Sequence, residues 1–228
     1  SSDETRISIP CGMSTVWRKT PVMQTLETWR ERLIDGIRTS SLSAQSSAAK
    51  SKRKPNFVIF LTDDQGYNDL GCYGSPRIET PHLDRMAAEG TRFTDFYVQP
   101  VCGVSRAALL TGMHEFRNGV THTQTPRDQL WKDATTLPEL LASAGYRTGF
   151  IGKWHLGNEW GYAPQDRGFQ WCSTNRDGPR EHFDPVMVRN CKREKVKGYR
   201  EDIYFDDAMK FITESGDQPF FAYLSTYS

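Results

Sequence analysis

The feature that most constrains the fold is a series of short apolar runs that alternate with helix signals. Residues 56–61 (NFVIFL) form an unbroken apolar, β-branched and aromatic run, which is typical of a strand buried on both faces. Residues 147–152 and 220–224 are further short strands by composition, and residues 92–98 alternate as a strand does. Strands that alternate with helices predict an α/β domain with a mostly parallel sheet flanked by helices.

The helices are predicted from their start and stop residues. Residues 80–90 (TPHLDRMAAEG) open with a capping residue and a proline and close on glycine, and residues 136–145 (TLPELLASAG) have similar signals. Residues 202–215 have the spacing of an amphipathic helix. The inner face of this last helix is expected to carry Ile203, Phe205, Ala208, Met209 and Ile212.

A further helix is predicted within residues 100–112, PVCGVSRAALLTG. Ser105 can cap a run of helix formers without β-branched residues, and Gly112 suits the left-handed end of a helix. Cys102 is therefore expected at or just before a helix N-terminus, where partial positive charge gathers, with Arg106 one turn on. A cysteine in that setting is either a candidate nucleophile or an inert packing residue, and this stretch alone does not decide between them.

Composition and charge argue against several classes of protein. The 228 residues carry a formal net charge of +1, so no overall field favours nucleic acid or an anionic membrane. No apolar run is long enough to span a bilayer. Five cysteines at wide spacings argue against a disulfide framework, and spacing leaves open whether Cys172 and Cys191 pair.

Residues 1–54 differ from the rest of the chain and are predicted to be an N-terminal extension and linker. Residues 25–37 have the spacing of an amphipathic helix, and from Ser40 a Ser/Ala-rich segment leads to a Lys/Arg cluster. The apolar core of a secretory signal is missing there, so no signal peptide is visible. The folded domain is expected over residues 55–228. Because the chain stops on its last predicted strand, we expect the C-terminal part of the domain to be missing.

Polar side chains follow three of the predicted strands. Asp63 and Asp64 follow the first strand, Cys102 the second, and Lys153 and His155 the third. Because ligands bind outside the carboxyl ends of parallel strands, these residues are expected at one edge of the sheet. Each has an ordinary structural interpretation when taken alone. Together they favour a metal-assisted site for an anionic ester, since a hard divalent cation relieves the repulsion of adjacent carboxylates.

Four motifs agree in order and spacing with a known family. They are PNFVIFLTDDQGYNDLGCYG from Pro55, TPHLDRMAAEGTRFTDFY from Thr80, CGVSRAALLTG from Cys102 and GYRTGFIGKWHLG from Gly145. With these motifs the chain resembles the N-terminal part of a sulfatase, in the alkaline phosphatase superfamily. The resemblance implies an alkaline phosphatase-like fold, hydrolysis of sulfate esters of a carbohydrate or an aryl alcohol, and export to the periplasm or the extracellular space.

The resemblance also implies how the ester is cleaved. Cys102 matches the cysteine that sulfatases convert to formylglycine with a dedicated generating machinery. One hydroxyl of the hydrated aldehyde attacks the ester sulfur, and the second then expels sulfate, which a serine could not do. Asp63 and Asp64 match metal ligands, usually for Ca²⁺ with Mg²⁺ as the alternative, and the ion also holds the converted Cys102 side chain.

The resemblance also implies roles for Arg106, Lys153 and His155. Arg106 matches the arginine that steadies the formylglycine. Lys153 resembles the lysine that binds sulfate oxygens. His155 resembles the histidine that hydrogen-bonds the diol and helps to discharge it, so it counts as both a catalytic and a substrate-binding residue. The family draws further ligands from later segments, so the present chain alone is not expected to complete the site.

One position departs from the family pattern, which is usually Cys-x-Pro-x-Arg. Val104 stands in place of the proline, and proline favours the extended conformation that the maturation machinery reads. Conversion of Cys102 is therefore left open at this point. Two alternatives stay beside the sulfatase: a phosphoester hydrolase of the same superfamily, and a non-catalytic sulfatase-like protein.

Overall fold

The computed structural model describes residues 6–8, 14–16, 54–175 and 181–227. Two short strands near the N-terminus, β1 (Arg6–Ser8) and β2 (Ser14–Val16), pair in antiparallel fashion. The helix expected over residues 25–37 and the linker up to residue 53 lie outside the described residues. The division of the chain near residue 54 therefore stays a prediction.

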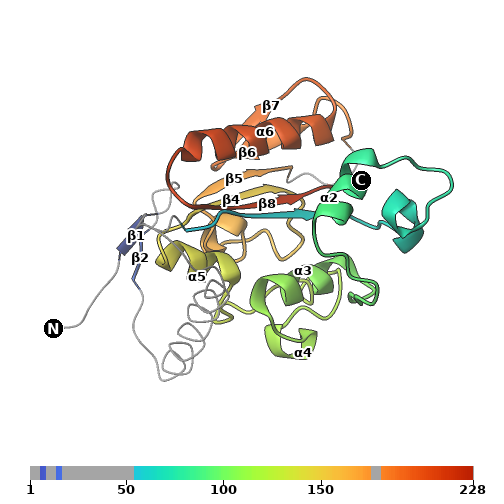
Figure 1. The fold of residues 1–228 in the computed structure, drawn as a ribbon. Coiled ribbons are helices and arrows are strands. Elements are labelled where there is room, and N and C mark those ends of the chain that lie inside the picture. The colour runs from blue at the N-terminus through green and yellow to red at the C-terminus, as the bar shows by residue number, and fades with distance from the viewer. Residues whose placement is uncertain (1–5, 9–13, 17–53, 176–180, 228) are drawn as a thin grey trace, which may run out of the picture.

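The main sheet has six strands in the order β3-β8-β4-β5-β6-β7 (Figure 1). The strands that run parallel are β3 (Phe57–Leu61), β8 (Phe220–Ser225), β4 (Arg147–Gly152) and β5 (Trp171–Thr174). The sheet is extended by an antiparallel hairpin of β6 (Val186–Arg189) and β7 (Lys192–Lys195). The mostly parallel sheet confirms the prediction, and the hairpin adds a part that was not predicted.

Helices cover both faces of the sheet. The helix α6 (Arg200–Ser215) packs on β8, β4 and β5, and α5 (Leu137–Ser143) contacts β4 from the opposite face (Figure 1). The remaining described helices are α2 (Pro81–Glu89), α3 (Cys102–Thr111), α4 (Glu115–Asn118) and the 3-10 turns η1 (Tyr67–Asp69), η2 (Gly71–Tyr73) and η3 (Pro164–Arg167). None of the helices in the described ranges is long and apolar enough to cross a bilayer.

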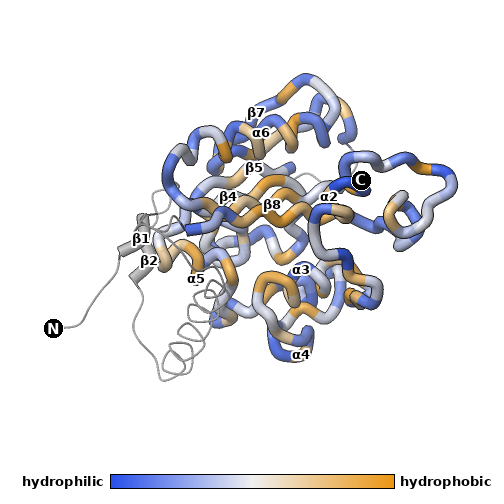
Figure 2. Tube along the Cα trace, in the orientation of Figure 1, coloured by the Kyte–Doolittle hydropathy of each residue, from blue (hydrophilic) through white to orange (hydrophobic). Residues whose placement is uncertain are grey.

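The two central strands contribute to a separate core on each face. Phe150 and Tyr223 pack in the core on the side of α3 and α5, whereas Ile151 and Leu224 pack under α6. This division follows from the strand itself, because successive side chains point to opposite faces. The need to fill both cores explains why residues 150–151 and 220–224 are apolar without a break, and Figure 2 shows the middle of the sheet in orange.

Two predictions about local structure were wrong. Residues 92–98 form no strand: they are mostly exposed, and no described strand pairs with them. An alternating pattern gives a strand only where a neighbour supplies the hydrogen-bond ladder. On α6, Phe205 and Met209 are 45% and 60% exposed, whereas Tyr204 and Phe211 are fully buried. The buried face of α6 is thus rotated from the predicted one.

The surroundings of β3 also differ from expectation, and the structure decides the pairing of Cys172 that the spacing left open. β3 lies at the edge of the described sheet, and Val58 and Phe60 on it are exposed rather than buried on both faces. Cys172 is a buried free thiol, whereas Cys191 is disulfide-bonded, so the two do not pair. Burial raises the pKa of Cys172, which keeps this thiol protonated and inert.

The start of α5 carries a half-buried carboxyl group that makes stability depend on pH. The Thr136 N–H donates to Glu139 Oε2 at 2.7 Å. Burial raises the pKa of Glu139, against Arg167 and Thr136, which lower it. The folded state therefore holds this proton more tightly than the unfolded chain. The contribution of Glu139 to stability is full below the unfolded pKa and is lost as the pH rises through the folded pKa.

We therefore expect Glu139→Gln to gain stability relative to the wild-type protein when the pH is raised from about 4 to about 7. Glutamine keeps the acceptor for the Thr136 N–H but does not titrate. The free energy of unfolding in urea, measured for both proteins at both pH values, checks this. A difference between the two proteins that stayed constant with pH would contradict it.

Candidate active site

The carboxyl ends of β3, β8 and β4 are held together by main-chain contacts. The Lys153 N–H donates to the Ser225 carbonyl at 2.9 Å, and the Thr226 N–H donates to the Leu61 carbonyl at 3.0 Å. Gly152 has a φ of +104°, and a Cβ there would lie 1.7 Å from the Ser225 carbonyl oxygen. Only glycine permits this close approach. Gly152 at the end of β4 therefore fixes the position of the Lys153 main chain beside β8.

The cysteine singled out from the sequence is the first residue of α3. Val101 before Cys102 is the extended N-cap residue, so the thiol lies at the end of the helix that carries partial positive charge. Gly112 ends the helix in the left-handed conformation, with a φ of +65°, as predicted. Ser105 does not cap the helix as predicted, because it lies inside α3 and its hydroxyl donates to the Gln99 carbonyl at 2.8 Å.

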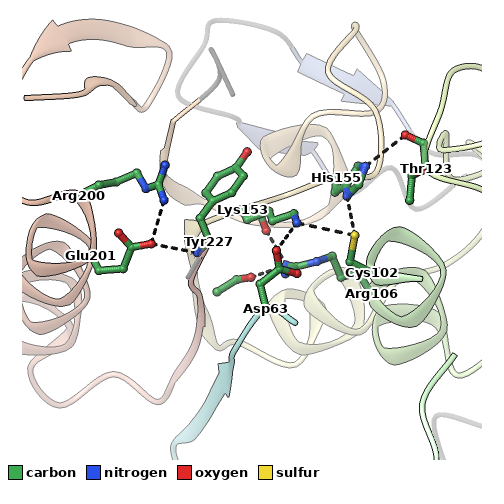
Figure 3. Close-up of polar contacts among 10 residues, drawn as sticks. Asp63, Cys102, Arg106, Thr123, Lys153, His155, Arg200, Glu201 and Tyr227 are labelled. Atoms are coloured by element: carbon green, nitrogen blue, oxygen red, sulfur yellow. Dashed lines mark hydrogen bonds and ion pairs between the residues drawn. The ribbon is translucent and has the colours of Figure 1, made fainter. Parts of the chain in front are cut away.

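Two side chains contact the Cys102 thiol (Figure 3). His155 Nδ1 lies 3.2 Å from Sγ, and Lys153 Nζ lies 3.7 Å from it. The other ring nitrogen, His155 Nε2, lies 3.3 Å from the carbonyl oxygen of Thr123, which can only accept. A proton on Nε2 leaves a lone pair on Nδ1 facing the thiol. His155 is thus placed to accept a proton from the Cys102 position.

The electrostatics of the site favour neutral His155. Burial lowers the pKa of His155, and the charges of Lys153 and Arg106 lower it further, while the Thr123 carbonyl and Asp128 act in the opposite direction. A histidine whose pKa falls below its usual range is uncharged at neutral pH. The imidazole is therefore in the form that can act as a base.

Asp63 is a buried carboxylate with two cationic partners. Lys153 Nζ forms a close ion pair with Oδ2, and Arg106 Nη2 lies 3.3 Å from Oδ1. Arg106 is only 2% exposed, and its Nη1 donates to the Lys153 carbonyl at 2.8 Å and to the Ser225 hydroxyl. One carboxylate thus faces two cations. The cluster carries an excess of positive charge, which suits an anionic substrate.

Asp64 stands apart from these contacts. It is exposed, and its φ of +50° lies in the left-handed region that few non-glycine residues adopt. The structure therefore brings five of the six predicted site residues into one network and leaves Asp64 beside it in the chain. Within the described ranges, no group of three or more His, Cys, Asp or Glu side chains is arranged to hold a metal ion.

Sequence reasoning missed three contributors to the site. Ser225 is the last residue of β8 and Tyr227 lies two residues beyond it, so the rule that placed the other residues at the carboxyl ends of strands could have found them. Thr123 contributes a main-chain carbonyl oxygen, which any residue carries. No sequence signal could have identified Thr123.

Several known proteins are similar to this chain in sequence. The family model for sulfatases matches residues 55–228. N-acetylgalactosamine-6-sulfatase of Canis lupus familiaris is 36% identical over 218 residues, covering 79% of this chain and 41% of that protein. Human arylsulfatase A is 46% identical over 140 residues, covering 59% of this chain and 28% of that protein. The chain thus spans less than half the length of these relatives.

Solved structures share the fold as well. The structure of BT4656 in complex with its substrate D-glucosamine-2-N,6-O-disulfate has a TM-score of 0.68 and 35% identity, over 75% of this chain and 34% of that one. Ps i-CgsB in complex with k-i-k-neocarrahexaose has a TM-score of 0.71 and 31% identity, over 76% of this chain and 45% of that one. The mostly parallel sheet with its flanking helices is the alkaline phosphatase-like fold of these proteins. With the family model matched from residue 55 to residue 228, the chain belongs to the sulfatase family.

Proposed function

We propose that residues 55–228 supply the N-terminal part of the catalytic domain of an enzyme that hydrolyses sulfate esters. The observation that carries this proposal is the environment of Cys102. Its thiol lies at the N-terminus of α3, 3.2 Å from a ring nitrogen of His155 and 3.7 Å from the ammonium of Lys153. Membership of the sulfatase family supports the same chemistry.

Each residue of the cluster has a task in such a reaction. Cys102, once converted to formylglycine by its generating machinery, would supply a hydrated aldehyde as the nucleophile. His155 accepts a proton at Nδ1 from that side chain, as its neutral form allows. Lys153 presents its ammonium to the sulfate oxygens. Arg106 is a positioning residue, because it holds Asp63 and the main chain of Lys153 in place.

The donor set suits a hard divalent cation. Asp63 and Asp64 follow each other in the chain and carry carboxylate oxygens, the ligands that Ca²⁺ and Mg²⁺ prefer, and an oxygen on the converted Cys102 side chain would be a third. Asp63 is buried beside two cationic side chains, so charged groups gather at this edge of the sheet. When bound, Ca²⁺ or Mg²⁺ would offset the negative charge of the sulfate group.

The substrate class proposed is a sulfated carbohydrate or a small aryl sulfate. The excess positive charge around Lys153 and Arg106 suits a sulfate monoester, which carries one negative charge. A structural relative is described with a disulfated glucosamine as its substrate, which supports the carbohydrate. As for location, family membership supports export from the cytoplasm.

Mass analysis of the peptide that contains Cys102 tests the nucleophile. In protein isolated from its native host, we expect the mass of the aldehyde in place of the thiol, although Val104 replaces the usual proline. Valine also favours an extended chain, so the motif remains readable by the maturation machinery. An intact thiol in every copy would rule out the formylglycine mechanism and favour a non-catalytic relative.

Parallel assays on the sulfate and phosphate monoesters of one aryl alcohol test the reaction class. We expect the full-length protein to hydrolyse the sulfate ester with a kcat/KM about tenfold or more above that for the phosphate ester, a usual size for discrimination by charge and contacts. The reverse preference would identify a phosphoester hydrolase instead. Using a single alcohol keeps the leaving group the same in both assays.

A further inference from the structure

Tyr227 lies between the active-site cluster and the start of α6 (Figure 3). The centroid of its ring is 5.2 Å from Lys153 Nζ and 4.5 Å from Arg200 Cζ. The face of an aromatic ring attracts cations, most strongly where water is excluded. Lys153 therefore has two attractive partners besides the Cys102 thiol, namely the carboxylate of Asp63 and the ring of Tyr227.

The position of the ring is fixed from α6. The Tyr227 N–H donates to Glu201 Oε1 at 3.2 Å, and the same oxygen accepts a hydrogen bond from Arg200 Nη2 at 3.1 Å. Arg200 is fully buried and Glu201 is 7% exposed. A buried ion pair resists rearrangement, because moving one partner leaves the other charge uncompensated. The main chain just before Tyr227 is held to β3 through Thr226 and Leu61.

The phenol group itself stays uncharged. Burial raises the pKa of Tyr227, against Arg200 and Arg106, which lower it. At neutral pH the side chain therefore meets Lys153 as a neutral aromatic ring, and no phenolate forms an ion pair with the ammonium.

We propose that Tyr227 is a positioning residue whose ring holds the Lys153 ammonium beside Cys102 and within reach of a sulfate group. This inference rests on the proposed function, because it needs Lys153 as the group that binds sulfate. Asp63 is the stronger partner of the ammonium, since it carries a full charge. Because Lys153 already pairs with Asp63, loss of the ring leaves that carboxylate as its main attractive partner, and the ammonium is less available to the substrate. The buried pair of Arg200 and Glu201 thereby connects α6 to sulfate binding.

Substitution of Tyr227 in the full-length protein tests this role. Tyr227→Leu removes the ring, and we expect it to raise both the KM for an aryl sulfate and the Kd for inorganic sulfate about tenfold, a loss within the range of a partly buried cation–π contact. The kcat should stay within about threefold of wild type, because the groups that touch the reacting atoms remain. Tyr227→Phe keeps the ring and should stay within about twofold in both constants.

The matched control is Tyr97→Leu, which removes a tyrosine that is 88% exposed. It should bind inorganic sulfate as the wild-type protein does. Equal binding of sulfate by Tyr227→Leu and the wild-type protein would overturn the proposal, as would a loss in Tyr227→Phe as large as that in Tyr227→Leu. Sulfate binding is measured by calorimetry without turnover, so a wild-type protein that binds sulfate but hydrolyses no sulfate ester would contradict the proposed function alone. A wild-type protein that bound no sulfate would overturn both.

Discussion

Replacing Cys102 with alanine is expected to abolish sulfate ester hydrolysis, with a fall in kcat on the order of 10⁴- to 10⁶-fold, the scale seen when a member of a covalent catalytic unit is removed. Alanine leaves His155 and Lys153 without the atom they both contact. Among the described contacts of these two side chains, Cys102 is the one residue that both touch. Initial rates on an aryl sulfate, with the full-length protein, measure the effect.

Two further variants separate the nucleophile from its surroundings. Cys102→Ser supplies one hydroxyl, so it can attack the ester but has no second hydroxyl to expel the sulfate. We expect this variant to release at most one alcohol per protein and to keep a sulfated serine that mass analysis detects. Cys72→Ala removes another free thiol, at a residue that contacts Asp84 and Arg92 rather than the Cys102 cluster, and should retain wild-type activity. Substantial turnover by Cys102→Ala would contradict the assignment of Cys102.

The strands that frame the site were predictable because their sequences satisfy one strong requirement. β4 begins and ends where residues 147–152 predicted it, and β8 extends the predicted strand by one residue. Both strands lie inside the sheet with a helix layer on each face, so the side chains that enter the two cores must be apolar. Their parallel direction then places the following residues at one edge. This is how Asp63, Lys153 and His155 could be grouped from the sequence.

The less predictable parts depend on tertiary contacts. β7 reads KREK and is exposed along its whole length, so only its pairing with β6 makes it a strand. The inner face of α6 was misassigned because Tyr204 is buried and Phe205 is not, a difference that follows from packing on the sheet. Tyr227 makes cation–π contacts with Arg200 and Lys153, which are distant from it in the sequence. No local sequence pattern predicts these contacts.

Arg106→Met is expected to cause the second large effect, a loss of folding stability. Arg106 is buried. Its guanidinium forms an ion pair with the Asp63 carboxylate and donates hydrogen bonds to the Lys153 carbonyl and the Ser225 hydroxyl. Methionine fills part of the same space but leaves all three groups without that donor. Breaking a buried pair in this way costs about 3–5 kcal/mol, a large share of the roughly 5–15 kcal/mol that stabilises a typical domain. Urea unfolding of the full-length protein measures the loss.

Arg85→Met is the matched control, because Arg85 pairs with Glu89 on the surface at 3.9 Å and its side chain is 71% exposed. We expect it to change the free energy of unfolding by about 0.5 kcal/mol or less. Adding Asp63→Asn to Arg106→Met should deepen the loss, since Lys153 still pairs with Asp63 in the single variant and would be left without a carboxylate in the double variant. If the Arg106 and Arg85 variants were equally stable, the guanidinium could not be what holds the ends of β3, β4 and β8 together. A double variant more stable than Arg106→Met alone would instead identify an uncompensated charge on Asp63 as the cause of the loss.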